Sequence, residues 1–144
     1  MSTAICTVSY DSDEYGQIKQ LRQDVLRTPI GLVLNEKDVA GEDSQTHIAA
    51  IEHGRVVGSV ILKALDGGVM KLRQMAVAQS HQGQGLGAKL VRFAEDEARA
   101  LGFEIIECHA RVSAQGFYEK LGWRTTGDTF EEVGLPTIKM NKAL

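Results

Sequence analysis

Hydrophobic and polar positions change their period along the first third of the chain. Residues 4–10 have the pattern of a short strand, and residues 13–27 place their apolar side chains at helical spacing. Pro29 favours the end of this helix. Residues 31–45 are polar and irregular, which predicts a surface loop or a broken short helix, a natural cover for a substrate.

The middle of the chain alternates between strand and helix patterns. Residues 46–52, 56–65 and 69–77 read as three strands separated by turn residues, which predicts an antiparallel meander. An apolar stripe at helical spacing then begins at Leu86 and ends before Gly102, the expected position of a C-terminal helix stop.

The last third begins with a predicted strand at 104–110. Because strand, helix and strand follow one another, this strand should lie parallel to the strand at 69–77. A shorter helix is expected from Ser113, its N-cap, to Leu121, followed by strands near 123–127 and 136–141.

Length and charge exclude several classes of protein. The chain has 144 residues, which predicts a single domain over 1–144. The net charge is −3, so no general basic field would attract nucleic acid or an anionic membrane. The start of the chain lacks a basic segment, and the longest apolar stretch is far shorter than a membrane span; we therefore expect a cytoplasmic protein. Two cysteines and four histidines without ligand spacing predict no metal site.

Three of the fifteen glycines, Gly83, Gly85 and Gly87, fall between the predicted strand at 69–77 and the long helix. Glycine permits a positive φ and a close approach of a ligand, and a helix N-terminus offers unpaired N–H groups. Together these features predict a site for a phosphate or pyrophosphate; the alternative is a plain tight turn. The spacing departs from the dinucleotide fingerprint G-x-G-x-x-G, and no Gly-Lys-Ser/Thr follows as in a P-loop.

Two motifs carry a resemblance to a known family. Gln82-x-x-Gly85-x-Gly87-Ala88 follows the strand at 69–77, and Phe-Tyr-Glu-Lys-Leu-Gly-Trp stands at 117–123. The chain thereby resembles the GNAT superfamily of acyl-CoA-dependent N-acetyltransferases. The resemblance implies an α/β fold with a mixed, mostly antiparallel sheet and a βαβ cofactor unit. It also implies transfer of an acetyl group from acetyl-CoA to a primary amine of a small molecule or peptide, without a metal.

The resemblance also implies which residues would bind acetyl-CoA. Backbone N–H groups would surround the pyrophosphate, and the backbone of Met75 and Val77 would pair with the pantetheine arm where the strands at 69–77 and 104–110 diverge. A strand edge suits an amide chain, and a helix terminus suits an anion. The residues expected around the pyrophosphate are Gln82, Gly83, Gln84, Gly85, Leu86, Gly87 and Ala88.

In the family, the tyrosine matching Tyr118 donates a proton to the departing thiolate. A phenol with a pKa near 10 is neutral at pH 7 and can serve as such an acid. The alternative is that Tyr118 only fills the core beside Phe117 and Leu121.

The sequence indicates the general base of the reaction less clearly than the general acid. Some members carry a Glu on the first strand that contacts the cofactor, where this chain has Lys71. His109 is the next candidate, since a histidine titrates near neutral pH, although a strand histidine is also commonly structural. A third route takes the proton to solvent through water and Glu107. Arg111 replaces the Asn of many relatives, so it would bind a phosphate or an acidic acceptor instead.

The acceptor amine is not identified by the sequence. Arg22 and Arg27 would select a carboxylate or phosphate, or else be solvated charges of a helix. Glu131 and Glu132 would attract a cationic amine, or else belong to a charged loop. Two other functions compete: a CoA-binding sensor without turnover, and a nucleotide-binding redox domain. Exposed final strands also leave a homodimer open.

Overall fold

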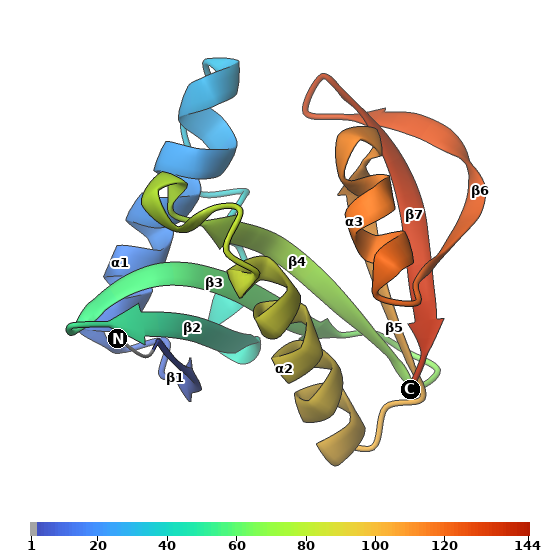
Figure 1. Cartoon of the computed structure of the whole chain (residues 1–144), viewed down its shortest axis with the longest axis horizontal. Coiled ribbons are helices and arrows are strands. Elements are labelled where there is room, and N and C mark those ends of the chain that lie inside the picture. Colours follow the sequence, from blue (N-terminus) through green and yellow to red (C-terminus); the bar gives the residue numbers. More distant parts are fainter. Residues whose placement is uncertain (1–2) are drawn as a thin grey trace.

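The computed structural model describes residues 3–144 and arranges them around one seven-stranded sheet (Figure 1). Within these residues β4 and β5 are parallel, and the other five neighbouring pairs are antiparallel. Along the sheet the order is β1 (Ala4–Val8), β2 (Thr46–Glu52), β3 (Arg55–Ala64), β4 (Val69–Val77), β5 (Ile105–Arg111), β7 (Leu135–Ala143) and β6 (Arg124–Glu132).

Three α-helices accompany the sheet: α1 (Asp13–Arg22), α2 (Leu86–Ala100) and α3 (Gln115–Lys120). A π-helical turn at Gln23–Arg27 continues α1, and short 3₁₀ turns lie at Thr28–Ile30, Glu42–Ser44, Gln79–His81 and Val112–Ala114. No helix in the described part of the chain is long and apolar enough to cross a membrane.

The predicted α/β fold is confirmed, including the antiparallel meander of β2, β3 and β4 and the parallel β4–β5 pair. Three expectations are wrong. Ser113 is not the N-cap of the short helix: it lies in the 3₁₀ turn Val112–Ala114, and Ala114 precedes the first residue of α3. The helix predicted over 13–27 loses α-geometry after Arg22, and the final strands are longer than expected. Because β6 extends to Glu132, Glu131 and Glu132 lie on a strand and not in a loop.

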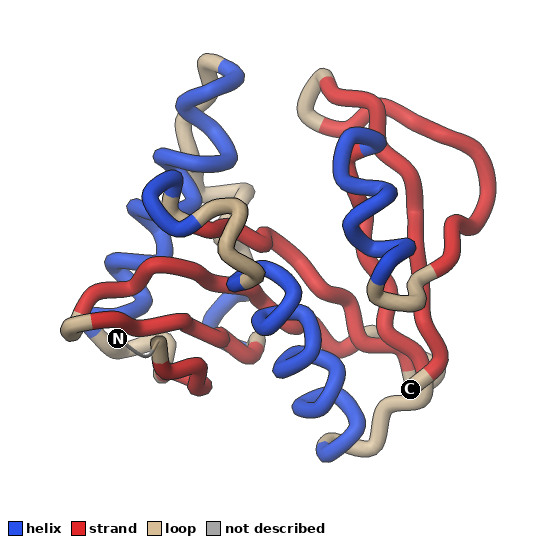
Figure 2. Tube along the Cα trace, viewed as in Figure 1, coloured by secondary structure: helices blue, strands red, loops and turns tan. Residues whose placement is uncertain are grey.

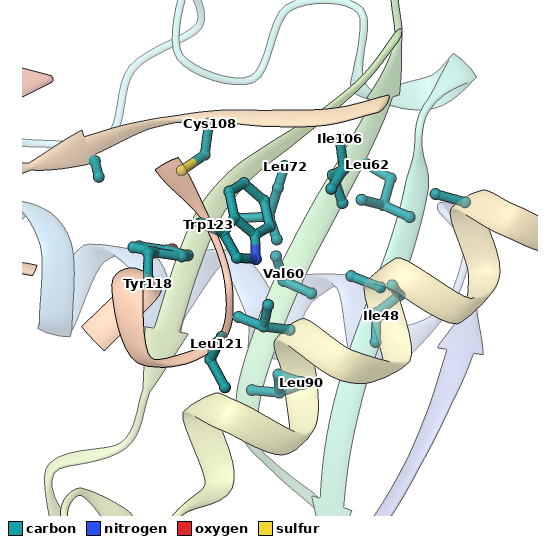
Figure 3. Packing of buried hydrophobic residues seen from close by; sticks show 14 of the residues in the cluster. Ile48, Val60, Leu62, Leu72, Leu90, Ile106, Cys108, Tyr118, Leu121 and Trp123 are labelled. Atoms are coloured by element: carbon teal, nitrogen blue, oxygen red, sulfur yellow. The ribbon is translucent and has the colours of Figure 1, made fainter. Parts of the chain in front are cut away.

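Helix α2 buries one face against the sheet. Leu90, Val91, Ala94 and Ala98 are fully buried, and they pack on the same side of the sheet as Val60. Figure 3 shows this layer continuing to Cys108, Tyr118 and Trp123, so α3 closes the far end of the same core. Removing this apolar surface from water is the main stabilising term for the arrangement.

Helix α1 packs against β3 and β4 and brings with it a buried ionic cluster. Arg22 is fully buried, and its Nη1 and Nη2 donate to the two carboxylate oxygens of Glu42 at 2.7 and 2.9 Å. The hydroxyl of Tyr15 donates to the same carboxylate at 2.7 Å, and Arg73 Nη1 lies 3.3 Å from it. Arg22 is therefore neither a solvated charge nor free to bind an acceptor, which corrects both expectations for this residue.

Strands β4 and β5 separate halfway along their length. They pair from Val69–Ile105 to Leu72–Cys108 and no further. The β3–β4 register then shifts, because β4 carries an extra residue, and Gln74 adopts a φ of +55°. Such a bulge bends the strand and increases its twist. Figure 2 shows the two strands close together near the C-terminus and well apart at their other ends.

Candidate active site

The opening between β4 and β5 contains a cavity of about 570 Å³. Its wall combines the bulge of β4, the end of β5, the start of α3 and the β6–β7 turn with the segment that follows α1. The lining residues include Arg27, Lys37, Asp38, Lys71, Arg73, Gln74, Met75, Cys108, His109, Arg111, Phe117, Tyr118, Glu132 and Val133.

Tyr118 belongs both to the core and to the cavity wall. Its ring packs edge-on against Phe117, with centroids 5.0 Å apart, and at 5.2 Å against Trp123. Burial, strengthened by the neighbouring Cys108 thiol, raises the pKa of Tyr118. The phenol therefore stays protonated at neutral pH and can act as a hydrogen-bond donor toward the cavity.

Cys108 lies beside Tyr118 at the point where β4 and β5 separate (Figure 3). Burial raises the pKa of its thiol to about 12. A thiol in this state is a poor nucleophile, because the thiolate is the reactive form. Cys108 is therefore poorly suited to act as a nucleophile at this position.

His109 faces the cavity from β5 and is paired with a carboxylate. Its Nδ1 lies 3.0 Å from Glu132 Oε1, and its ring packs edge-on against Phe130. A carboxylate only accepts, so Nδ1 carries the hydrogen and Nε2 of the neutral ring is left with a lone pair. Among residues 3–144, Nε2 has no hydrogen-bond partner. This arrangement matches a histidine oriented as a general base.

Lys71 occupies the strand position where a carboxylate base was considered. Its side chain lines the cavity, and burial lowers its pKa, assisted by the charges of Arg73 and Lys63. Glu132 and Glu107 oppose this lowering. No carboxylate of the described residues approaches Lys71 within ion-pair distance.

The segment that follows α1 contributes Arg27 and Asp38 to the cavity wall. Arg27 is nearly buried, and its Nη2 lies 3.5 Å from Asp38 Oδ1. Arg27 therefore differs from the solvated helix charge that was one of the two expectations. The backbone carbonyl of Asp38 also accepts from Arg73 at 3.4 Å, which fixes the segment 31–45 against β4.

The glycine loop combines left-handed glycines with a helix end that no side chain of the described residues caps. Gly83 and Gly85 have φ values of +76° and +82°, and an added Cβ at either residue would meet no atom within 4 Å. Gly85 is the N-cap of α2, and no side chain caps this end of the helix. The N–H groups of the first turn are thus open to a ligand. These features fit the pyrophosphate of CoA.

The loop and the cavity lie on either side of a close packing contact. A Cβ added to Gly87 would come within 3.4 Å of the Phe117 ring and 3.6 Å of the Met75 methyl carbon. The Gln82 side chain donates to the Val77 carbonyl at 2.9 Å, which ties the loop to the end of β4. The expected pantetheine contacts of Val77 therefore compete with Gln82 for that carbonyl oxygen.

The cavity brings together Met75, His109 and Tyr118 from the predicted residues, whereas residues 82–88 lie outside its wall. Sequence reasoning considered Glu132 as a charge that attracts a cationic amine, but it missed the pairing of Glu132 with His109 and the bulge at Gln74. The charge of Glu132 is visible in the sequence, but its partner is not, because Glu132 comes 23 positions after His109. Gln74 carried no signal, since a positive φ at glutamine follows from the bulge.

Comparison with known proteins agrees with this geometry. The family model described as acetyltransferase (GNAT) domain matches residues 22–144. An acetyltransferase of Bacillus subtilis (strain 168) is 32% identical over 114 residues, which cover 79% of this chain and 76% of that protein. An N-acetyltransferase structure from Lactobacillus plantarum superposes with a TM-score of 0.90 at 26% identity, covering 100% of this chain and 99% of that one.

The fold is also shared with an aminoglycoside 6'-N-acetyltransferase complexed with coenzyme A. That structure has a TM-score of 0.80 at 17% identity and covers 97% of this chain and 96% of its own. The family match spans most of the chain, from Arg22 to the last residue. The chain therefore belongs to the GNAT family of acetyltransferases and is an N-acetyltransferase.

Proposed function

We propose that this enzyme transfers the acetyl group of acetyl-CoA to a primary amine by direct attack, with His109 as base and Tyr118 as acid. The observation that carries the proposal is the cavity between β4 and β5, whose wall includes both the Tyr118 ring and the His109–Glu132 pair. Acetyl-CoA would supply the acetyl group in activated form, as a thioester.

The binding of acetyl-CoA is divided between two places. Backbone N–H groups of residues 82–88 would hold the pyrophosphate at the uncapped start of α2, where the helix dipole favours an anion. Beyond the bulge, the backbone of Met75 no longer pairs with β5 and is open to the pantetheine arm. Phe117 and Met75 pack against Gly87, and this contact fixes the position of the glycine loop relative to the cavity.

His109 would remove the proton from the acceptor ammonium group. Glu132 holds the ring in the tautomer whose Nε2 can accept that proton, and it stabilises the imidazolium that forms. The carboxylate also favours approach of a cationic amine. Position 71 holds a lysine and so offers no carboxylate base, and Glu107 lies outside the cavity wall, 3.4 Å from Lys139 Nζ. The histidine is therefore the better-placed base.

Tyr118 would donate a hydrogen bond to the thiolate as it departs. Its raised pKa keeps the donor hydrogen in place at neutral pH. Such general acid–base steps typically contribute about 10²- to 10⁴-fold in rate.

The test is release of CoA from acetyl-CoA with a library of primary amines, followed by the His109→Gln and Glu132→Gln variants. We expect kcat to fall by about 10²- to 10⁴-fold for His109→Gln and less for Glu132→Gln. Because the two residues act as a unit, the double variant should be no slower than His109→Gln.

Two outcomes would contradict the proposal. Binding of acetyl-CoA without turnover of any amine would indicate a sensor instead of an enzyme acting through this site. Full activity of His109→Gln at saturating substrates would remove His109 from the mechanism. The matched control is His53→Gln, which changes an exposed histidine of the β2–β3 turn that is not part of the cavity wall.

A further inference from the structure

Arg111 ends β5 with a charge that the protein does not neutralise. Its Nη2 donates to the Leu26 carbonyl at 3.3 Å, and in residues 3–144 no carboxylate lies within ion-pair distance of it. The side chain is half-buried in the cavity wall. Burial lowers the pKa of Arg111, and the nearby charge of Arg27 lowers it further. Both effects oppose the charged form, so a counter-charge would stabilise this position.

The cavity as a whole carries more positive than negative charge. Its two carboxylates are already engaged, since Asp38 pairs with Arg27 and Glu132 with His109. Arg73 is engaged as well, by the buried carboxylate of Glu42 at 3.3 Å. Within residues 3–144, the cations of the wall that have no carboxylate within ion-pair distance are Lys37, Lys71 and Arg111.

Arg111 is the best placed of the three to bind an anion. Lys37 is an exposed side chain. Lys71 lies in the part of β4 that still pairs with β5, opposite Glu107. The Leu26 carbonyl orients the Arg111 guanidinium while most of its five N–H donors are left for a ligand. A guanidinium presents those donors in a fork that matches a carboxylate or a phosphate.

The position of Arg111 relative to His109 limits the size of the ligand. The two residues are separated by one position on β5, so they share a face and their Cα atoms are about 7 Å apart. An amine at His109 Nε2 and an anion at Arg111 would therefore belong to one small molecule or chain end.

We propose that Arg111 binds a carboxylate or phosphate group of the acceptor, so that the substrate is a primary amine with an anionic group a short spacer away. This inference rests on the proposed function, because it takes His109 as the position of the amine. The pyrophosphate of CoA is assigned to the glycine loop at 82–88, which lies outside this wall, so Arg111 is left for the acceptor.

The first experiment measures anion binding without turnover. The protein is saturated with CoA, so that its phosphate site is filled, and thermal unfolding is followed during titration with sodium acetate or sodium phosphate. Sodium chloride at equal ionic strength corrects for screening. We expect saturable stabilisation by one of the two anions, and the more effective anion identifies the acceptor's group.

The variant Arg111→Gln should weaken this anion binding by about ten- to a hundredfold, the usual effect of losing a charge-assisted hydrogen bond. The control is Arg99→Gln, which changes an arginine of α2 paired with Asp96 on the surface. If Arg111→Gln and wild type bind both anions equally, or if neither anion stabilises wild type beyond chloride, the inference is wrong.

The second experiment compares amines in matched pairs: β-alanine with β-alaninamide, and phosphoethanolamine with ethanolamine. Wild type should show a lower KM for the anionic member of one pair, and Arg111→Gln should abolish that preference by raising its KM at least about tenfold. Equal use of both members by wild type would overturn the inference and leave acetyl transfer intact. Absence of turnover with every amine would count against the proposed function, while the anion titration would still decide the role of Arg111.

Discussion

At the residue scale, Tyr118 joins the hydrophobic core to the reacting groups. Its ring packs against Phe117 and Trp123, whereas its hydroxyl lies near Cys108 at the cavity wall. Tyr118→Phe keeps the ring and removes only the hydroxyl. We therefore expect kcat to fall by about 10²- to 10⁴-fold. The affinity for acetyl-CoA, measured by calorimetry, should be nearly unchanged.

The thermal midpoint of Tyr118→Phe separates a catalytic loss from a structural one. Since the ring packing is retained, the variant should unfold close to wild type. Cys108→Ala serves as the matched control, because it removes the neighbouring thiol and leaves the phenol in place. Wild-type turnover in Tyr118→Phe at saturating substrates would exclude the acid role.

The sequence identifies single residues best when a motif fixes their element. Tyr118 was proposed from such a motif and His109 from the predicted strand at 104–110, and both line the cavity. Arg22 was misjudged, because its partner Glu42 comes from a polar segment without any periodic pattern. Side-chain pairs formed across such a segment depend on the tertiary fold and leave no local signal.

At the scale of elements, the start of α2 is the feature that we assign to the CoA phosphates. Gly85 has a φ of +82° and open space around it. Gly85→Glu would strain the backbone and add a negative charge where an anion is expected. We expect the affinity for CoA to fall by about ten- to a hundredfold, from the loss of one or two charge-assisted hydrogen bonds and the added repulsion. Isothermal titration calorimetry measures this change.

Gly102→Glu provides a closely matched control. Gly102 follows the other end of α2, has a φ of +88° and is equally free of neighbours. The substitution thus imposes similar backbone strain with the same charge, but far from the loop. If both variants lose the same affinity, strain in α2 explains the effect; if neither does, the assignment of the loop is wrong.

The sequence predicted the elements well and their ends less well. Strands β2 and β4 and helix α2 were placed almost to the residue, since turn residues and a strong apolar stripe bound them. The π-helical turn at Gln23–Arg27 keeps apolar residues at nearly helical spacing, so the pattern could not separate it from α1. Strand β6 is exposed along most of its length, which removes the alternation that reveals a strand.

At the scale of the whole molecule, the Glu42 cluster connects three parts that are distant in the sequence. Arg22 comes from α1, Arg73 from β4, and Glu42 from the end of the segment 31–45. His47 Nε2 also donates to the Glu42 carbonyl at 2.7 Å. The same segment carries Asp38, which forms part of the cavity wall. The cluster therefore holds one side of the active site against the sheet.

Glu42→Gln tests this connection through stability. The substitution leaves the buried charge of Arg22 without its counter-charge, which should lower the free energy of unfolding by about 3–5 kcal/mol at neutral pH. Asp96→Asn, which breaks an exposed ion pair, should cost less than about 1 kcal/mol. Urea unfolding measures both. An equal, small effect of the two substitutions would show that the cluster contributes little to stability.

Comparison of wild type with Glu42→Gln also tests how the contribution of Glu42 to stability depends on pH. Burial alone would raise the pKa of Glu42, but hydrogen bonds from Arg22 and Tyr15 and the charges of Arg22 and Arg73 outweigh it and hold the pKa below its ordinary 4.5. A carboxyl with a lowered folded-state pKa stabilises the protein above its unfolded pKa and loses that contribution as the pH falls through the folded value. The stability difference between wild type and Glu42→Gln should therefore be constant near neutrality and shrink below about pH 4.5. A difference that stays constant into strong acid would place the source of stability elsewhere than in the ionised carboxylate.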